Sequence, residues 1–592
     1  MRCPILIGVL CHFSAAAGAD SLCVDVSVRA AGGGVWLGEI AADGQPLLRL
    51  RGTDEGSLRQ RAGEVAQRLR QLALDGIRAG DIAAEAHPAG ASVTIRGKPL
   101  VNIDSLLAEL SGMSAWELAT AWERRLREAF SNTYLMLEPA KLLVPYGEAR
   151  TIAIGGTAVG RFSCSLYAED IVQVAPTQDG AGVAVRGVGV GSTAVSVERG
   201  GHSGVVTIDV RKWAAAIAES ARAVVTGGSK TNPALRSAVM NAVLAVVRPE
   251  PNAVVRVGLP VPVERHDAFA VSVEATGDGY IPARRETQVR IVNTPAPGLA
   301  TTGLLVSNDP ELIAAPGLLM VGKLPPSQAV RLLYHHKNAM SHPCQLVVAL
   351  DNVSEQPAQV HVTDAAAGPH RDELFVGHAA TRRFTERLRS EHGCVLQIPA
   401  GRRADIRTHM LGPGEVASGL ARLSSLNAAD VRITVTAGGG SDGTGYFPFV
   451  PAEVRRAPAG SDCVFQPEKR ITASYTVGRA WLFVDIGREA VADRRGSRLQ
   501  GNYGVWYQIK VDVQNPGDES ARIDIAVRAG GGPAWGVFSI DEQVLETPLL
   551  SPGQERVLKV LTLGARASRT VAIRTMPEAA SSYPVTLIVR SR

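Results

Sequence analysis

The stretch that decides the fold is Val348-Ala349-Leu350-Asp351-Asn352, which is followed after a short turn by Ala358-Gln359-Val360-His361-Val362. Apolar residues recur at every second position, and this period of two predicts a strand, an asparagine-containing turn and a return strand. The same pattern recurs at Val511-Asp512-Val513-Gln514-Asn515 and at 521–525, with a constant offset of 163 residues and no insertion. The match favours two related β units, although two unrelated sandwiches can share so short a pattern.

Each copy of the pattern is followed by a Pro-Gly turn before another strand. The turns are Leu411-Gly412-Pro413-Gly414-Glu415 and Leu550-Ser551-Pro552-Gly553-Gln554. A strand, an asparagine turn, a return strand and a later Pro-Gly turn are typical of an immunoglobulin-like sandwich. We therefore expect β-sandwiches over 301–440 and 446–592, with matching strand order around the two asparagines.

The N-terminal part of the chain is organised differently. Between residues 20 and 137, strand patterns alternate with two helical patterns, one over 58–74 and one that begins at the capping box Ser114-x-x-Glu117. This mixture predicts a small α+β module. Short strands with frequent turn residues then predict a sandwich over 138–212.

Residues 213–249 are rich in alanine and helical in pattern, and we expect a connector of two helices there. Strand patterns resume over 250–300 as a β segment. The expected fold class is therefore mainly β, with several Ig-like β-sandwich domains in series, an N-terminal α+β module and a short helical connector. The length of 592 residues fits several domains of roughly 100 to 200 residues each.

The first residues have the features of a signal peptide. Arg2 precedes a short apolar run, and small residues stand at Ala17 and Ala19, which predicts a signal peptide over 1–19 with cleavage after Ala19. The apolar run is far shorter than the roughly 20 residues that span a bilayer. We expect an exported protein without a transmembrane segment in the mature chain, located in the periplasm, at the cell surface or outside the cell.

Charge and cysteine usage exclude several classes of function. The 62 basic and 57 acidic residues form no block of like charge, so nothing predicts a nucleic-acid partner. The seven cysteines include no C-x-x-C pair, which leaves a zinc ribbon and a thioredoxin-type site unsupported. Cys344 and Cys394 are candidates for a disulfide in an oxidising compartment, and two small buried apolar side chains are an equally good interpretation.

Two N-terminal segments resemble known modules. With Val144-Pro145-Tyr146-Gly147-Glu148 at its start and Gly191-Ser192-Thr193-Ala194-Val195-Ser196-Val197 near its end, the segment 139–212 resembles bacterial Ig-like and pilus-secretin N-terminal modules. The segment 58–69, followed by Val93-x-Ile95-x-Gly97, is similar to an extracytoplasmic module found beside some bacterial channels. No channel segment follows, so the resemblance implies no channel function.

Three further segments resemble a group of uncharacterised exported bacterial multidomain β-sandwich proteins. They are Ser307-Asn308-Asp309-Pro310-Glu311, Arg331-Leu332-Leu333-Tyr334-His335-His336-Lys337-Asn338 and Gly501-Asn502-Tyr503-Gly504-Val505. Some members of that group carry a copper-amine-oxidase-like stalk domain. The stalk is not recognisable in this sequence, so the resemblance implies neither copper nor amine oxidation.

Histidines are concentrated in one region, where eight of the 12 lie between His335 and His409. Converging imidazoles bind transition metals, and His335, His336 and His342 are the candidate ligands. The first two point to opposite faces of a strand, so at most one of them faces any given site. Surface or hydrogen-bonded histidines are the better interpretation. We predict no cofactor and expect no stoichiometric transition metal in the purified protein.

Aromatic residues cluster in the last unit, where Tyr503, Trp506 and Trp535 are candidates for a ligand-binding face of the kind that holds sugars. A sandwich core is the better interpretation, because aromatic side chains usually supply burial. The segment Gly201-His202-Ser203-Gly204 lacks the fifth glycine and the strand-to-helix context of a hydrolase nucleophile elbow.

The sequence therefore predicts an exported, non-catalytic structural or interaction protein of the cell envelope or surface, with an envelope or surface protein or a glycan as partner. No catalytic residue is assigned. The alternative is a secreted enzyme that acts on cell-wall glycans, or a metal-dependent enzyme, because unfamiliar sites are not visible as short motifs.

Overall fold

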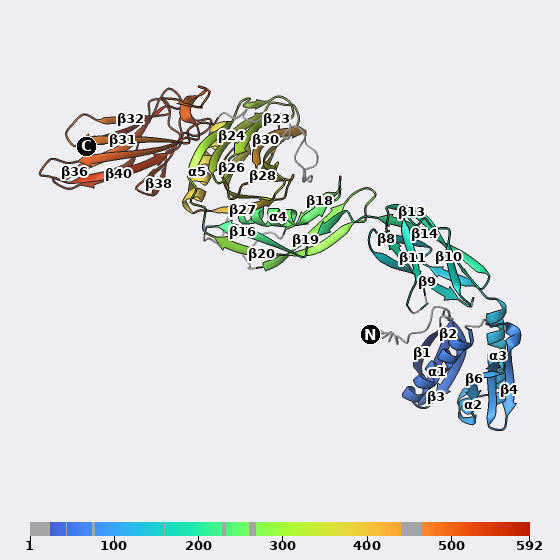
Figure 1. Ribbon diagram of the computed structural model, residues 1–592. Coiled ribbons are helices and arrows are strands. Elements are labelled where there is room, and N and C mark those ends of the chain that lie inside the picture. The colour runs from blue at the N-terminus through green and yellow to red at the C-terminus, as the bar shows by residue number, and fades with distance from the viewer. Residues whose placement is uncertain are drawn as a thin grey trace. The chain divides into compact units, whose positions relative to one another are not determined.

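The computed structural model describes residues 24–42, 44–73, 77–158, 160–178, 180, 182–227, 233–259, 268–439 and 464–592. The expected signal peptide and Cys463 lie outside these residues. Two compact units are present, one formed by 1–213 with 278–281 and one by 214–277 with 282–592 (Figure 1). Strands predominate over helices in both, which confirms the mainly β fold class. Within the described ranges, no helix combines the length and apolar character needed to cross a bilayer.

The first unit begins with the α+β module. Its elements are β1 (Asp25–Gly32), β2 (Val35–Ala42), β3 (Gln45–Gly52), α1 (Glu55–Ala73), β4 (Ile82–His87), β5 (Gly90–Ile95), β6 (Lys98–Ile103), α2 (Ser105–Ser111) and α3 (Ala115–Ser131). Helix α1 packs on the sheet β1-β2-β3, and α3 packs on the sheet β4-β5-β6 (Figure 1). The capping box is confirmed, because Glu117 N–H donates to Ser114 Oγ at 3.2 Å and Ser114 N–H donates to the Glu117 carboxylate at 2.8 Å.

A sandwich of two four-stranded sheets follows in the same unit. The sheets have the orders β10-β13-β14-β8 and β11-β12-β9-β7. The strands are β7 (Leu135–Glu138), β8 (Lys141–Pro145), β9 (Ala149–Gly156), β10 (Phe162–Ser165), β11 (Val172–Pro176), β12 (Gly182–Gly187), β13 (Gly191–Arg199) and β14 (His202–Arg211). Arg199 pairs with His202 across the β13–β14 hairpin, so the Gly-His-Ser-Gly segment joins strand to strand as the sequence indicates.

The connector differs from the expected pair of helices. Its described residues form the strands β15 (Ala215–Ile217), β16 (Ser220–Thr226) and β17 (Val247–Pro249), and one helix, α4 (Leu235–Ala245). The alanine-rich run that includes Ala221 and Ala223 is extended because β16 pairs with strands on both sides, and this pairing outweighs the helix propensity of alanine.

Ten strands of the second unit form one sheet, in the order β18-β19-β20-β16-β27-β26-β29-β24-β21 with β22 beside β24. The bounds are β18 (Val254–Gly258), β19 (Ala268–Thr276), β20 (Ala283–Thr294), β21 (Thr301–Ser307), β22 (Leu312–Ile313), β24 (Ala329–Asn338), β26 (Ala358–His370), β27 (Gly393–Ile398) and β29 (Val416–Ser425). The expected β segment over 250–300 thus supplies three strands of a sheet that continues past residue 300.

A four-stranded sheet, β23-β30-β25-β28, completes the first sandwich of this unit. It consists of β23 (Gly317–Leu324), β25 (Cys344–Asn352), β28 (Arg403–Leu411) and β30 (Val431–Gly439). Between β26 and β27 the chain forms the helix α5 (Glu373–Arg389), which packs on β26 and β29.

The second sandwich has the sheets β31-β35-β40-β37-β38 and β32-β41-β36-β39. Its strands are β31 (Glu468–Thr476), β32 (Leu482–Ile486), β35 (Trp506–Gln514), β36 (Ala521–Ala529), β37 (Val537–Ile540), β38 (Gln543–Glu546), β39 (Glu555–Leu563), β40 (Ser568–Thr575) and β41 (Val585–Ser591). A small hairpin of β33 (Val491–Ala492) and β34 (Arg498–Leu499) lies before β35.

The strand order of the two sandwiches matches around the two asparagines. In the first, β25 pairs with β28, while β26 pairs with β27 and β29, all antiparallel. In the second, β35 pairs with β40, while β36 pairs with β39 and β41, again antiparallel. The insertion between the second and third matched strands is helix α5 in one copy and the hairpin β37–β38 in the other.

Asn352 and Asn515 occupy equivalent turns, as the 163-residue offset predicts. Each Nδ2 donates to the carbonyl oxygen four residues later, at 2.8 Å for Asn352 and 2.7 Å for Asn515. Each also donates to a carbonyl at the end of the strand that pairs with the return strand, Ile398 at 2.9 Å and Leu563 at 3.4 Å. Each Oδ1 accepts the backbone N–H two residues later.

Asn338 is a third asparagine of this kind, which the sequence comparison did not reveal. It ends β24, its Nδ2 donates to His342 O and Leu411 O at 2.9 Å each, and its Oδ1 accepts from Met340 N–H at 2.9 Å. All three asparagines stand where the chain leaves one sheet for the other. We call them the corner asparagines.

Replacing a corner asparagine should destabilise the second unit. Asn352→Ala or Asn515→Ala leaves buried carbonyl oxygens without their donors, because both side chains are at most 3% exposed. We expect each variant to lower the free energy of unfolding by about 1–3 kcal/mol, measured by urea-induced unfolding. The exposed Asn293 in β20 is a matched control in the same unit, and Asn293→Ala should change stability by less than about 0.5 kcal/mol. Equal effects of the three variants would contradict the role of the corners.

Candidate functional site

The two sandwiches of the second unit share one hydrophobic core. Helix α5 and strands of the ten-stranded sheet contribute Leu304, Leu333, Val376, Phe384 and Leu420, and the second sandwich contributes Tyr507, Val511, Phe538 and Ile573. A Cβ at Gly377 would lie 1.9 Å from the Ala579 carbonyl oxygen, so α5 approaches the second sandwich as closely as backbone allows. The seam between the two sandwiches is therefore a packed interior.

A buried arginine crosses this seam. Arg331 is 2% exposed, and its Nη1 donates to the carbonyl oxygens of Pro467 and Gly504 at 2.9 Å each. Its guanidinium carbon lies 5.8 Å from the ring centre of Trp506. Two of the three segments behind the resemblance to exported proteins thus meet at the seam, since Arg331 belongs to one and Gly504 to the other.

A second polar contact crosses the seam at His378 of α5. Its Nδ1 lies 2.9 Å from Glu578 Oε2 and its Nε2 lies 3.2 Å from Glu546 Oε2. The ring stacks on Trp535 with 4.4 Å between ring centres and an angle of 3°. Glu578 is fully buried, and its Oε1 has no hydrogen-bond partner within the described part of the chain.

Two pKa values in this cluster are shifted upward, each for a different reason. Burial acts to lower the pKa of His378, but hydrogen bonds and the charges of Glu578 and Glu546 outweigh it and raise the pKa above 6.5. Burial raises the pKa of Glu578 above 4.5, and His378 offsets part of that effect. Both groups bind protons more tightly in the folded chain than in the unfolded chain.

Stability of the seam should therefore fall as the pH rises. The contribution of His378 is fully present below its unfolded pKa of 6.5 and is lost as the pH rises through its raised folded pKa. The raised pKa of Glu578 acts in the same direction from 4.5 upward. We expect His378→Gln to lower the free energy of unfolding by about 3 kcal/mol in mildly acidic buffer, and by less in alkaline buffer.

The measurement is calorimetric unfolding of the wild-type protein and of the His378→Gln variant, in buffers from mildly acidic to alkaline pH. His342→Gln is the matched control, because that side chain is exposed. A His378→Gln effect that is constant with pH, or one that grows as the pH rises, would contradict the assignment.

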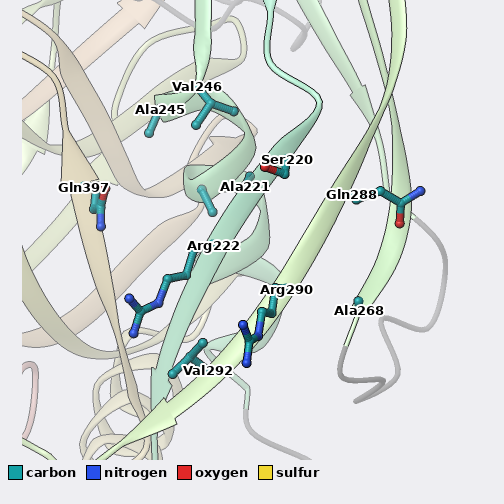
Figure 2. A pocket seen from close by; sticks show the side chains of 11 residues that line it. Ser220, Ala221, Arg222, Ala245, Val246, Ala268, Gln288, Arg290, Val292 and Gln397 are labelled. Carbon is teal, nitrogen blue, oxygen red and sulfur yellow. The ribbon is translucent and has the colours of Figure 1, made fainter.

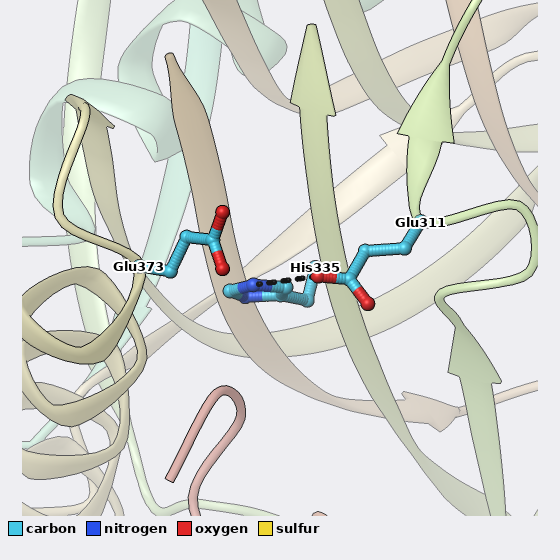
Figure 3. Close-up of side chains that lie close together, drawn as sticks. All are labelled: Glu311, His335 and Glu373. Carbon is cyan, nitrogen blue, oxygen red and sulfur yellow. Dashed lines mark ion pairs between the residues drawn. The ribbon is translucent and has the colours of Figure 1, made fainter. Parts of the chain in front are cut away.

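The cluster Glu311, His335 and Glu373 lies in the first sandwich of the second unit. One ligand atom from each of these residues lies within 4.8 Å of the other two. His335 comes from β24, Glu373 is the first residue of α5, and Glu311 precedes β22. Figure 3 shows the imidazole between the two carboxylates, with His335 Nε2 at 3.8 Å from Glu311 Oε1.

Burial favours the neutral form of the His335 imidazole, and the Lys337 ammonium group lies beside the Glu373 carboxylate. Burial lowers the pKa of His335 to about 4. Burial and the charge of Glu373 raise the pKa of Glu311, and Lys337 partly opposes them. Lys337 Nζ lies 2.7 Å from Glu373 Oε1.

The other sequence candidates do not join this cluster. His336 points to the opposite face of β24, where its Nε2 lies 2.8 Å from Ser307 Oγ and its Nδ1 lies 3.0 Å from Pro310 O. His342 is exposed. Among the remaining buried histidines, His361 contacts Thr226 Oγ1 and His409 contacts Tyr334 Oη, both at 2.9 Å.

The three aromatic candidates take part in contacts at or near the seam. Tyr503 Oη donates to Ser581 O at 3.1 Å, and Trp535 Nε1 donates to Thr547 O at 2.9 Å. Trp506 lies beside Arg331. All three are partly buried.

For Cys344 and Cys394, the sequence left open a disulfide or two small buried side chains, and the structure has two separate thiols. Both are free and buried. Cys344 begins β25 in the four-stranded sheet, whereas Cys394 lies in β27 of the ten-stranded sheet, so their partners across the ladders belong to different sheets. Burial raises the pKa of the Cys394 thiol, as expected for a small apolar side chain.

A groove of about 650 Å³ lies over β16, β20 and α4. Arg222 and Arg290 stand directly opposite each other on the parallel strands β16 and β20 and line this groove (Figure 2). Ser220, Gln288 and Gln397 add polar groups. Both arginines are exposed.

Sequence reasoning did not find the acidic members of these clusters. Glu311 and His335 stand in two of the three segments that resemble the exported bacterial proteins. The presence of both segments in one resemblance was the signal that could have linked these two residues. Glu373, Glu546 and Glu578 are separated from their histidines by tens to hundreds of residues, and no local pattern relates them.

Residues 39–133, which fall within the α+β module, match the model of a family described as Domain of unknown function (DUF8459). No curated protein matches the chain in sequence. Among solved structures, the chain is similar to domains 4 and 5 of the S-layer protein SbsC, at 19% identity and a TM-score of 0.12, over 13% of this chain and 46% of that one. It is also similar to the human desmocollin-1 ectodomain, at 8% identity and a TM-score of 0.13, over 47% of this chain and 58% of that one. The chain spans about half the length of these two structures, and likenesses of this degree carry no functional argument.

Proposed function

We propose that this chain is an exported, non-catalytic interaction protein of the cell envelope or surface, in the periplasm, at the surface or outside the cell. The observation that carries the proposal is the seam, where two sandwiches share a core and are joined by buried polar contacts. Such a unit is a rigid spacer that presents a surface at a fixed position.

The use of titratable side chains supports this role. His336, His361, His378 and His409 each have a hydrogen-bond partner within the fold. Each of these contacts fixes the orientation of the imidazole and ties together the segments that carry the two partners, as a rigid spacer requires.

The arginine groove is the surface that we propose for the partner, an envelope or surface protein or a glycan that carries carboxylates. Like charges directly opposite each other on neighbouring strands destabilise a sheet, so an anion between Arg222 and Arg290 is favourable. Guanidinium groups bind carboxylates through paired hydrogen bonds.

Export and the absence of catalysis are tested together. Cell fractionation with N-terminal sequencing should find the mature chain outside the cytoplasm, beginning at Asp20, because the small residues before it fit signal-peptide cleavage. The purified protein should not hydrolyse peptidoglycan. A cytoplasmic chain with Met1 intact would refute the location, and hydrolysis of a polysaccharide would favour the alternative of a secreted enzyme.

The groove is tested by binding to an acidic polysaccharide that carries uronic acids. The double variant Arg222→Gln/Arg290→Gln should weaken binding at least about tenfold, since each lost charge-assisted contact is worth about 1.5–3 kcal/mol. Arg236→Gln/Arg256→Gln is the control, because it removes two exposed arginines of the same unit outside the groove. If the two double variants weaken binding equally, the overall positive charge of the protein holds the polysaccharide, and the groove does not.

A further inference from the structure

We propose that Glu311, His335 and Glu373 form a binding site for one divalent transition-metal ion of the zinc class. The proposal goes beyond the interaction role and revises the expectation of a metal-free protein. It concerns a part of the second unit that shares no residue with the arginine groove.

The first support is the geometry of the donor atoms. Zinc binds histidine nitrogen and carboxylate oxygen at about 2.0–2.2 Å, so tetrahedral ligands are separated by about 3.4 Å. His335 Nε2 and Glu311 Oε1 are already at 3.8 Å, and the third donor lies within 4.8 Å. Both glutamates are partly exposed, at 48% for Glu311 and 36% for Glu373, so small side-chain rotations bring the three donors to an ion.

The second support is independent of the acidic residues. His335 is only 4% exposed, and neither of its ring nitrogens has a hydrogen-bond partner within the described ranges. A buried polar group without a partner costs free energy, so its presence calls for an occupant. The buried histidines His336, His361, His378 and His409 all have partners, which sets His335 apart.

The mixture of donors selects the class of ion. Magnesium and calcium prefer oxygen ligands alone, whereas imidazole suits zinc, copper, iron and nickel. Three protein donors leave a fourth position open to water, as in zinc sites that bind an external group. The partly exposed carboxylates keep that position open to solvent.

Lys337 competes with the ion for Glu373. It lies two residues after His335 on β24, and its ammonium group holds one carboxylate oxygen of Glu373. The second oxygen of that carboxylate remains for a metal. Lys337 therefore lowers the affinity of the site, and its removal should strengthen metal binding. A purely structural cluster predicts no such gain.

The experiment is a titration of the full chain with zinc in competition with a chromophoric chelator. We expect one zinc per chain, with binding weakened at least about tenfold by Glu311→Gln or Glu373→Gln, because even groups behind the ligands contribute that much. Lys337→Met should tighten binding. Glu355→Gln, which changes an exposed glutamate in a turn of the same sandwich, should leave it unchanged.

Cobalt provides a readout of the coordination itself. Cobalt added to the wild-type chain should give the intense visible absorption of a four-coordinate ion, and His335→Ala should abolish it while the unfolding transition is retained. If His335→Ala does not fold, zinc titration of the Glu311, Glu373 and Lys337 variants still tests the proposal. Zinc binding that is absent, or that is the same in the Glu311, Glu373 and Glu355 variants, would overturn the proposal.

Discussion

A strand that passes from one sheet of a sandwich to the other leaves backbone carbonyls without ladder partners, and the second unit meets this constraint with buried amides. Asn338, Asn352 and Asn515 each donate to carbonyls at a crossing and accept a backbone N–H two residues later. Because a buried unpaired carbonyl costs free energy, these three side chains determine where the chain can turn. The strand pairings on either side of each crossing depend on them.

The seam between the two sandwiches follows from the same constraint on buried polar groups. The insertion in the first copy is a helix, and its His378 reaches Glu578 of the second copy. Arg331 satisfies two carbonyls there. Polar groups that have partners on both sides of an apolar interface specify one arrangement of the two sandwiches, because any other arrangement leaves them unpaired.

His335 stands out against this background. Its neighbour His336 has two hydrogen-bond partners, although the two histidines belong to one strand and are both buried. The difference arises from the alternation of side chains across the strand, which sends one ring toward Ser307 and the other toward two carboxylates. In the described part of the chain, an imidazole without a hydrogen-bond partner therefore lies beside acidic groups, in the most histidine-rich region of the sequence.

Several features could be predicted from the sequence, because they depend on neighbours along the chain. The period-two runs indicated the strands, the 163-residue offset indicated the equivalent corners at Asn352 and Asn515, and Ser114 with Glu117 indicated the start of a helix. Alternation alone separated His335 from His336. These rules work because each pattern, including the one that recurs at the offset, lies within a short stretch of the chain.

Tertiary structure decided the rest. The alanine-rich stretch around Ala221 became a strand because partners distant in sequence pair with it on both sides. Cys344 and Cys394 were placed in different sheets by the same crossings that the asparagines hold. The carboxylates beside His335 and His378 come from segments that local patterns do not connect, since long-range packing brings them together. The sequence by itself therefore determined most of the strands and the corners at Asn352 and Asn515. Only the fold decided which charged groups meet, because charge contacts depend on distance in space and not on spacing along the chain.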